Sequence, residues 1–125
     1  MTPRLDHIGL DVRDYEASKS FYEQALAPLG ITFMMEPVAQ VGGFGGDFPF
    51  FWVAKRGCGP DSGVHVAFTA ENRETVHAFH SAALAAGGRD NGGPGVREIY
   101  HPHYYAAFVL DPDGNNIEAV CHTPA

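Results

Sequence analysis

Hydrophobic and polar residues follow two different periods along the first half of this chain, and the two periods predict different elements. Residues 5–12 alternate between apolar and polar character, which is typical of a β-strand. Over residues 17–29 apolar side chains recur at every fourth position, which predicts an amphipathic helix with Asp14 as its N-cap. Strand character returns at 31–38 and again at 48–54, where the run is almost wholly apolar and suits a strand buried on both faces.

Segments rich in glycine and proline mark the breaks between these elements. Residues 42–46 hold four glycines around Phe44 and predict a hairpin or a mobile loop. Residues 56–63 contain almost nothing apolar and predict a linker that divides the chain into halves. The second half is then expected to hold a strand at 64–70, an amphipathic helix through 76–86, a turn cluster at 91–95, and strands within 99–110 and at 117–121.

The two halves repeat each other. When the sequence is shifted so that His7 aligns with His65, further matching pairs appear in the same register. They are Ile8 with Val66, Leu10 with Phe68, Phe21 with Phe79, Ala25 with Ala83, Leu26 with Leu84 and Gly30 with Gly88. The repeat predicts two equivalent modules, at about 4–56 and 63–122, within one domain that spans 1–125.

Composition narrows the classes of partner. A chain of 125 residues can bury a sizeable core, and its formal net charge of −7 argues against nucleic acids and anionic membranes as partners. Cys58 and Cys121 form no closely spaced pair, so we expect free thiols in a reducing compartment. The N-terminal residues lack the apolar core of a signal peptide, and no run is long enough to span a membrane, so we expect a cytoplasmic protein.

A candidate metal site comes from His7, His65 and Glu118. The acidic residue Glu118 lies among apolar residues of the final predicted strand, after the turn formed by 111–114, whose aspartates suit turn geometry. Two imidazoles and one carboxylate form the ligand set of a facial triad, which leaves positions open to water or substrate. On residues alone the alternatives stay open, since a lone strand histidine is commonly structural and Glu118 could be an exposed strand residue.

Titratable and hydroxyl groups concentrate just before the strand that precedes Glu118. His101, His103, Tyr104 and Tyr105 are candidates for proton transfer and for orienting a ligand rich in oxygen, and we place them as the catalytic residues of the candidate site. The alternative is an amphipathic segment that only leads into the strand.

Four motifs together resemble the vicinal oxygen chelate superfamily, which includes glyoxalase I, extradiol dioxygenases, fosfomycin-resistance thiol transferases and bleomycin-binding proteins. They are the LDHIGL sequence at 5–10, SFY at 20–22, VHVAF at 64–68 and LDPDGNNIE at 110–118. The resemblance implies an α+β fold of two βαβββ modules, whose paired mixed sheets form a curled half-barrel cleft around a metal ion. It also assigns the ligand roles to His7, His65 and Glu118.

The function implied by the resemblance is that of a metal-dependent dioxygenase or lyase, which acts on a small oxygen-rich molecule and uses one divalent ion (Fe, Mn, Zn or Ni). The segment 48–54 lacks the Glu or Gln that glyoxalase I carries there, and Phe108 stands where dioxygenases have a tyrosine. Two alternatives remain: a bleomycin-resistance-like protein that binds a small molecule without catalysis, and a fosfomycin-type thiol transferase. Open sheet edges and the aromatic run at 48–52 lead us to expect a homodimer.

Overall fold

The computed structural model describes residues 5–55 and 64–125. The predicted linker at 56–63, which includes Cys58, lies outside the described residues. Cys121 is a free, buried cysteine, as the sequence predicts.

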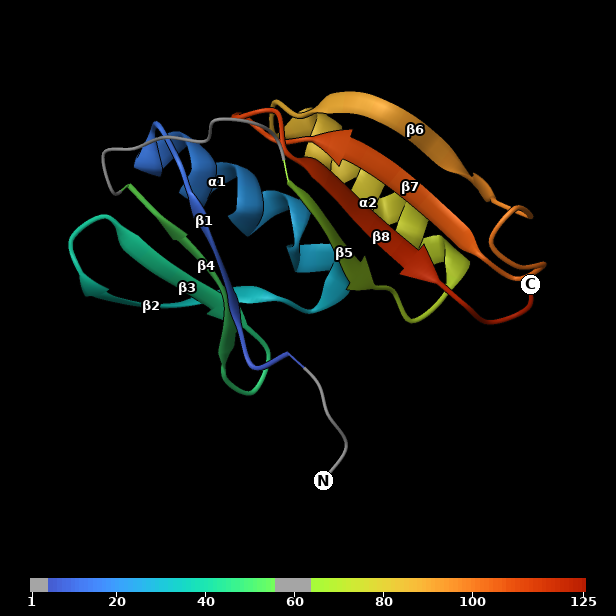
Figure 1. The fold of residues 1–125 in the computed structure, drawn as a ribbon, viewed down its shortest axis with the longest axis horizontal. Helices are drawn as coiled ribbons and strands as arrows, with labels where there is room; N and C mark the ends of the chain where they lie inside the picture. The colour runs from blue at the N-terminus through green and yellow to red at the C-terminus, as the bar shows by residue number, and fades with distance from the viewer. Residues whose placement is uncertain (1–4, 56–63) are drawn as a thin grey trace.

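The first module is a four-stranded sheet with one long helix (Figure 1). Its elements are β1 (Ile8–Asp11), α1 (Tyr15–Ala25), a short 3-10 helix η1 (Ala27–Leu29), β2 (Thr32–Val38), β3 (Val41–Gly45) and β4 (Pro49–Ala54). The strand order is β1-β4-β3-β2, in which β1 and β4 are parallel and the other neighbours antiparallel. The helix begins where predicted, because the side chain of Asp14 accepts a hydrogen bond from the Ala17 backbone nitrogen at 3.1 Å.

The second module repeats this plan. Its elements are β5 (His65–Thr69), α2 (Arg73–Ala85), β6 (Arg89–Val96), β7 (Tyr105–Leu110) and β8 (Asn116–Cys121). The strand order is β5-β8-β7-β6, and β5 runs parallel to β8 as β1 does to β4. The predicted fold class, α+β with two βαβββ modules, is confirmed; the sheets are separate and form no closed barrel.

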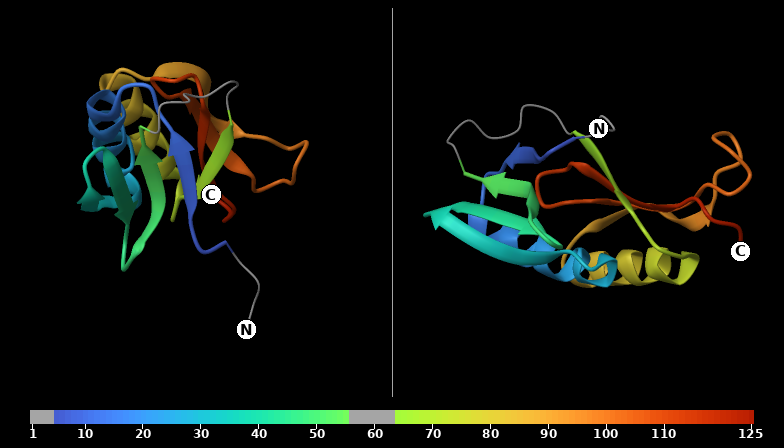
Figure 2. Two further views of the ribbon diagram at one scale, coloured as in Figure 1. Left: turned by 60° about the vertical axis from the view of Figure 1, so that its left-hand side comes forward. Right: turned by 90° about the horizontal axis from the view of Figure 1, so that it is seen from below.

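One hydrophobic core serves both modules. The helices α1 and α2 pack against each other along one side of the molecule (Figure 2). Phe51 of β4 contacts Tyr22 of α1 and also Phe68 of β5, with ring centroids 4.8 and 5.2 Å apart. Each sheet therefore has a helix face, which carries these core residues, and an opposite face. We call the opposite face the site face.

Two glycine-rich segments form strands in the structure. The expected turn cluster at 91–95 forms part of β6, which as an edge strand tolerates Pro94 and the register shifts around Gly92. For 42–46 the sequence predicts a hairpin or a mobile loop, and the structure has a strand there: β3 pairs antiparallel with β2 and β4, and its glycines make room for aromatic rings. A Cβ atom built on Gly43 would lie 2.7 Å from the ring of Trp52.

The turn between β7 and β8 is fixed by the carboxylate of Asp111. One carboxylate oxygen accepts from the backbone nitrogens of Asp113 and Asn115, at 2.9 and 2.8 Å. The other accepts from the Asn115 side chain at 2.8 Å and from the Tyr22 hydroxyl at 2.5 Å. Tyr22 lies on α1, so this buried carboxylate joins the first module to the turn that leads into β8.

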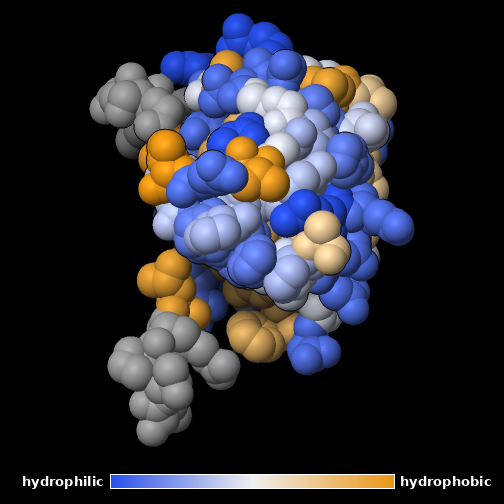
Figure 3. Space-filling model, turned by 90° about the vertical axis from the view of Figure 1, so that its right-hand side faces the viewer, coloured by the Kyte–Doolittle hydropathy of each residue, from blue (hydrophilic) through white to orange (hydrophobic). Residues whose placement is uncertain are grey.

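The surface is mixed in character. On the face shown in Figure 3, hydrophobic areas are small and separated by hydrophilic residues. Leu5, Phe48 and Ile99 are among the large apolar side chains that reach solvent. None of the helices in the described part of the chain combines the length and the apolar character needed to cross a membrane.

Candidate metal and substrate site

His65 and Glu118 meet on the site face of the second sheet. Ala67 pairs with Glu118 in the parallel register of β5 and β8, and His65 shares a face with Ala67 because alternate strand residues point the same way. The His65 Nε2 atom lies 2.9 Å from Glu118 Oε1. The Glu118 side chain is only 2% exposed, whereas that of His65 is about half exposed, so the pair opens to solvent on the histidine side.

The hydrogen-bond partners of His65 fix its tautomer. Its Nδ1 atom lies 3.1 Å from the backbone oxygen of Asn116, and because a carbonyl oxygen can only accept, Nδ1 must carry the proton. In neutral His65 the Nε2 atom then presents a lone pair to the Glu118 carboxylate. Two acceptors 2.9 Å apart require a proton or a metal cation between them.

His7 of the first module also has an oxygen beside its Nδ1 atom, but this oxygen belongs to the side chain of the preceding residue. Its Nδ1 atom lies 2.7 Å from a carboxylate oxygen of Asp6, which leaves Nε2 of the neutral ring unprotonated. His7 and His65 line one cavity of about 330 Å³ at the start of β1 and β5. Among residues 5–55 and 64–125, however, no three His, Cys, Asp or Glu side chains lie close enough to hold an ion together. The structure therefore joins His65 to Glu118 and places His7 on the wall of the same cavity.

Tyr104 is the second partner of Glu118. Its hydroxyl donates a short hydrogen bond to Glu118 Oε2. Burial, reinforced by this bond to the carboxylate, raises the pKa of Tyr104 to about 12, so the phenol keeps its proton at neutral pH. Tyr104 thus holds the carboxylate oxygen that does not face His65.

A pair of histidines packs against the Tyr104 ring. His101 Nε2 lies 2.9 Å from Nδ1 of His122, and the Tyr104 ring meets both imidazoles edge-on. The backbone nitrogen of His103 donates to His101 Nδ1 at 3.0 Å, so in neutral His101 the proton sits on Nε2 and is donated to His122. The prediction from sequence did not include His122. Alternation along β8 places it on the face of Glu118, and that signal could have found it.

Tyr105 lies on the other face of β7. Its hydroxyl is 2.6 Å from His77 Nε2, and the Arg73 guanidinium stands 4.6 Å from its ring centroid. Of the four residues predicted for catalysis, the structure brings Tyr104 to Glu118, places His101 and His103 beside Tyr104, and turns Tyr105 toward α2.

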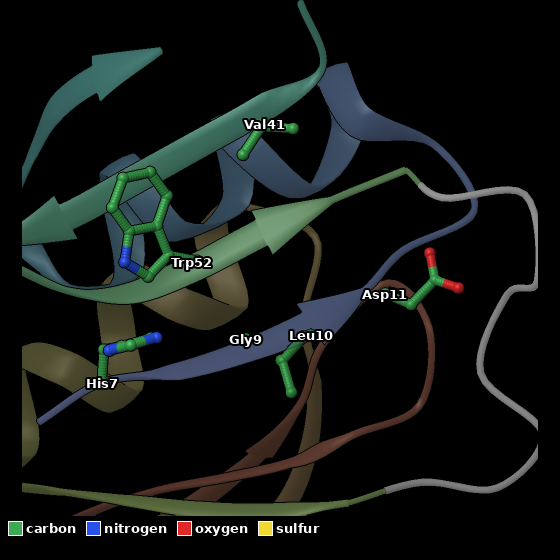
Figure 4. A pocket seen from close by; sticks show the side chains of 6 residues that line it. All are labelled: His7, Gly9, Leu10, Asp11, Val41 and Trp52. Carbon is green, nitrogen blue, oxygen red and sulfur yellow. The ribbon is translucent and has the colours of Figure 1, made fainter. Parts of the chain in front are cut away.

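A second cavity, of about 650 Å³, opens on the site face of the first sheet (Figure 4). Its lining residues are His7, Gly9, Leu10, Asp11, Val41 and Trp52. His7 is among the lining residues of both cavities.

The family model of the Glyoxalase/Bleomycin resistance protein/Dioxygenase superfamily matches residues 4–119. The chain belongs to this superfamily. Its members usually use a metal ion. The resemblance of the motifs at 5–10 and 110–118 to this superfamily is thereby confirmed.

Solved structures of several proteins have the same fold. A glyoxalase/bleomycin resistance protein from Albidiferax ferrireducens T118 is 29% identical, with a TM-score of 0.80 over 94% of this chain and 98% of that one. A glyoxalase/bleomycin resistance protein/dioxygenase family enzyme from Burkholderia phytofirmans PsJN is 21% identical, with a TM-score of 0.75 over 97% and 100% of the two chains. Lactoylglutathione lyase from Agrobacterium tumefaciens is 15% identical, with a TM-score of 0.71 over 96% and 94%. Among curated proteins, none matches the chain significantly.

Proposed function

We propose that this chain is a metal-dependent enzyme of the superfamily, with His7, His65 and Glu118 as ligands, and that it acts on a small molecule with neighbouring oxygen atoms. The observation that carries the proposal is the contact between His65 and Glu118. A histidine whose Nδ1 proton is committed to a backbone carbonyl turns its other nitrogen toward a buried carboxylate at 2.9 Å.

The donor atoms fit a divalent ion. Two neighbouring ligands that each lie about 2.0–2.2 Å from one ion are about 3 Å apart, as these two atoms are. Metal-binding histidines usually donate their other ring N–H to a carbonyl or carboxylate, and both His65 and His7 do so. A buried carboxylate also needs a compensating partner. Mixed nitrogen and oxygen donors suit Fe, Mn, Zn or Ni.

The residues around Glu118 define its chemistry. When bound, a divalent ion would supply Lewis-acid stabilisation to a substrate oxygen that gains negative charge. Tyr104 keeps its proton and orients the Glu118 carboxylate, which makes it a hydrogen-bond donor rather than a base at neutral pH. His101, hydrogen-bonded to the exposed His122, can pass a proton between the neighbourhood of Tyr104 and solvent.

Metal titration tests the proposal. Protein stripped with a chelator should bind one Zn²⁺ or Mn²⁺ per chain in isothermal titration calorimetry. Proton release on binding should depend on pH, because histidine and carboxylate side chains bind an ion in their deprotonated forms. His65→Ala and Glu118→Gln should each weaken Zn²⁺ binding by at least about 100-fold. The control His80→Ala removes an imidazole that pairs with Asp90 on another surface, and it should leave Zn²⁺ binding unchanged. Unchanged Zn²⁺ affinity in both site variants, with native circular dichroism, would refute the metal site.

The origin of the third ligand and the proposed homodimer can be tested together. His7→Ala and Glu118→Ala chains are mixed under conditions that exchange subunits, and Zn²⁺ binding is compared with that of each variant alone. Recovery in the mixture means that one site takes His7 and Glu118 from different copies. Absence of recovery, with exchange verified by native mass spectrometry, means that one chain supplies both.

A further inference from the structure

Trp52 has a glycine beside it on each neighbouring strand. In the registers of β1, β4 and β3, Trp52 pairs with Gly9 on one side and Gly43 on the other. The indole lies over Gly43, where a built Cβ atom would come within 2.7 Å of two ring carbons. A Cβ atom at Gly9 would instead make only ordinary contacts, 3.9 Å from Trp52 Cβ. Gly9 therefore leaves the strand surface beside the indole without a side chain, and this surface forms the base of the cavity (Figure 4).

The internal repeat gives this tryptophan a defined place. Gly9 pairs with Trp52 across β1 and β4, just as Ala67 pairs with Glu118 across β5 and β8. Because His7 corresponds to His65, Trp52 occupies in the first module the position that Glu118 occupies in the second. The first module thus presents a flat indole where its twin presents a carboxylate.

The surroundings of the indole select the charge of a ligand. Of the residues that line this cavity in the described part of the chain, Asp11 is acidic and none is Lys or Arg. Asp6 stands next to His7, at 2.7 Å from its ring nitrogen. The lining of the cavity therefore includes a carboxylate but no Lys or Arg that could offset the charge of an anionic ligand, so a neutral ring is favoured.

We propose that the cavity over Gly9 binds a planar, uncharged ring of the substrate, stacked on Trp52, with the chelating oxygens of the substrate directed toward His7. The inference rests on the proposed function, since it treats the cavity beside His7 as part of the substrate site. It adds a chemical class, neutral flat ring compounds, and a residue that selects for it. Stacking on an indole favours flat rings over saturated ones of similar size.

The test uses metal-free protein and three matched probes: naphthalenecarboxamide, the corresponding naphthalenecarboxylate, and the saturated decahydronaphthalenecarboxamide. Trp52 is the single tryptophan of the chain, so intrinsic fluorescence reports on this cavity alone. We expect the planar carboxamide to quench the emission with saturation. The anionic and the saturated probes should each bind at least about tenfold more weakly.

Three variants assign the binding to the cavity, with affinities measured by calorimetry. Trp52→Leu removes the flat ring and should weaken carboxamide binding about tenfold, whereas Trp52→Phe keeps one and should lose less than about threefold. Gly9→Val places a side chain in the cavity over Gly9, so it should block binding. Because valine is favoured in strands, the circular dichroism of the parent should be kept. Equal binding of the planar and saturated probes, or unchanged binding in Trp52→Leu and Gly9→Val, would overturn the proposal.

The result separates this inference from the metal site. If the parent protein binds Zn²⁺ normally but does not prefer the planar probe over the saturated one, only the stacking cavity is refuted. Normal ring selectivity in a protein that binds no Zn²⁺ refutes the proposed metal chemistry and retains the cavity.

Discussion

The hydroxyl of Tyr22 offers a sharp test of how the two modules are joined. Tyr22 is fully buried, and its hydroxyl donates at 2.5 Å to Asp111, whose own exposure is 2%. Tyr22→Phe removes this donor and keeps the ring, so no large cavity is created. A hydrogen bond to a charged group is worth about 1.5–3 kcal/mol. Asp111 keeps three other donors after the change, so the lower part of that range applies, roughly 1.5–2 kcal/mol.

This loss is large enough to measure by urea unfolding, in which the midpoint should fall while the slope m stays unchanged, because the surface exposed on unfolding is the same. For a chain of this size a loss of 1 kcal/mol lowers Tm by about 3–5 °C, so the variant should melt roughly 5–10 °C lower. Burial and the neighbouring Asp111 raise the pKa of Tyr22 well above its ordinary value. The stabilisation is therefore fully present below about pH 10, the ordinary pKa of tyrosine, and is lost only as the pH rises through the raised value.

The matched control is Tyr100→Phe, since Tyr100 is 61% exposed. That control should change the free energy of unfolding by less than about 0.5 kcal/mol. If Tyr22→Phe falls in the same range, the bond between α1 and the turn before β8 contributes nothing, and the view of Asp111 as the joint between the modules is wrong.

Three further changes test separate parts of the structure. Asn72→Ala removes the N-cap of α2 and should cost about 1 kcal/mol in urea unfolding. Gly43→Ala should displace the indole of Trp52, cost about 1–3 kcal/mol, and shift the tryptophan emission to longer wavelength; an unshifted emission would contradict the packing. The hydrogen bond from His80 lowers the pKa of Asp90. The contribution of ionised Asp90 to the stability of the fold is therefore present above the ordinary carboxyl pKa and is lost as the pH falls through the lowered value. Asp90→Asn should accordingly be less stable than the parent near neutral pH, and the difference should vanish in strong acid.

Much of the fold could be predicted from the sequence because the signals are local and occur twice. The modules are defined without knowledge of contacts by three signals. These are the alternation at 5–12, the apolar residues at every fourth position in 17–29, and the matching pairs in the second half. Glycine misled the prediction at 91–95, where an expected turn cluster is part of β6. It marks turns in general, but Gly42 and Gly43 lie within β3, where small size makes room for Tyr15 and Trp52.

The candidate site was less predictable, because its contacts depend on strand register. His65 and Glu118 are far apart in sequence and meet through the parallel pairing of β5 with β8, which no local pattern encodes. Tyr104 and Tyr105 look equivalent in the sequence. Only the start of β7 at Tyr105 decides that Tyr104 points to Glu118 and its neighbour to α2.

The repeat also explains how a symmetric fold can carry an asymmetric site. The first residue of each module's site face is a histidine with its Nδ1 proton committed to an oxygen, so both modules present the same kind of nitrogen. They differ at the equivalent positions on β4 and β8, which hold Trp52 and Glu118. A carboxylate at both positions would place two negative charges beside an ion. An indole at one of them leaves a single carboxylate and adds a flat apolar wall. In the function proposed for this chain, the second module therefore serves the ion and the first selects the ring.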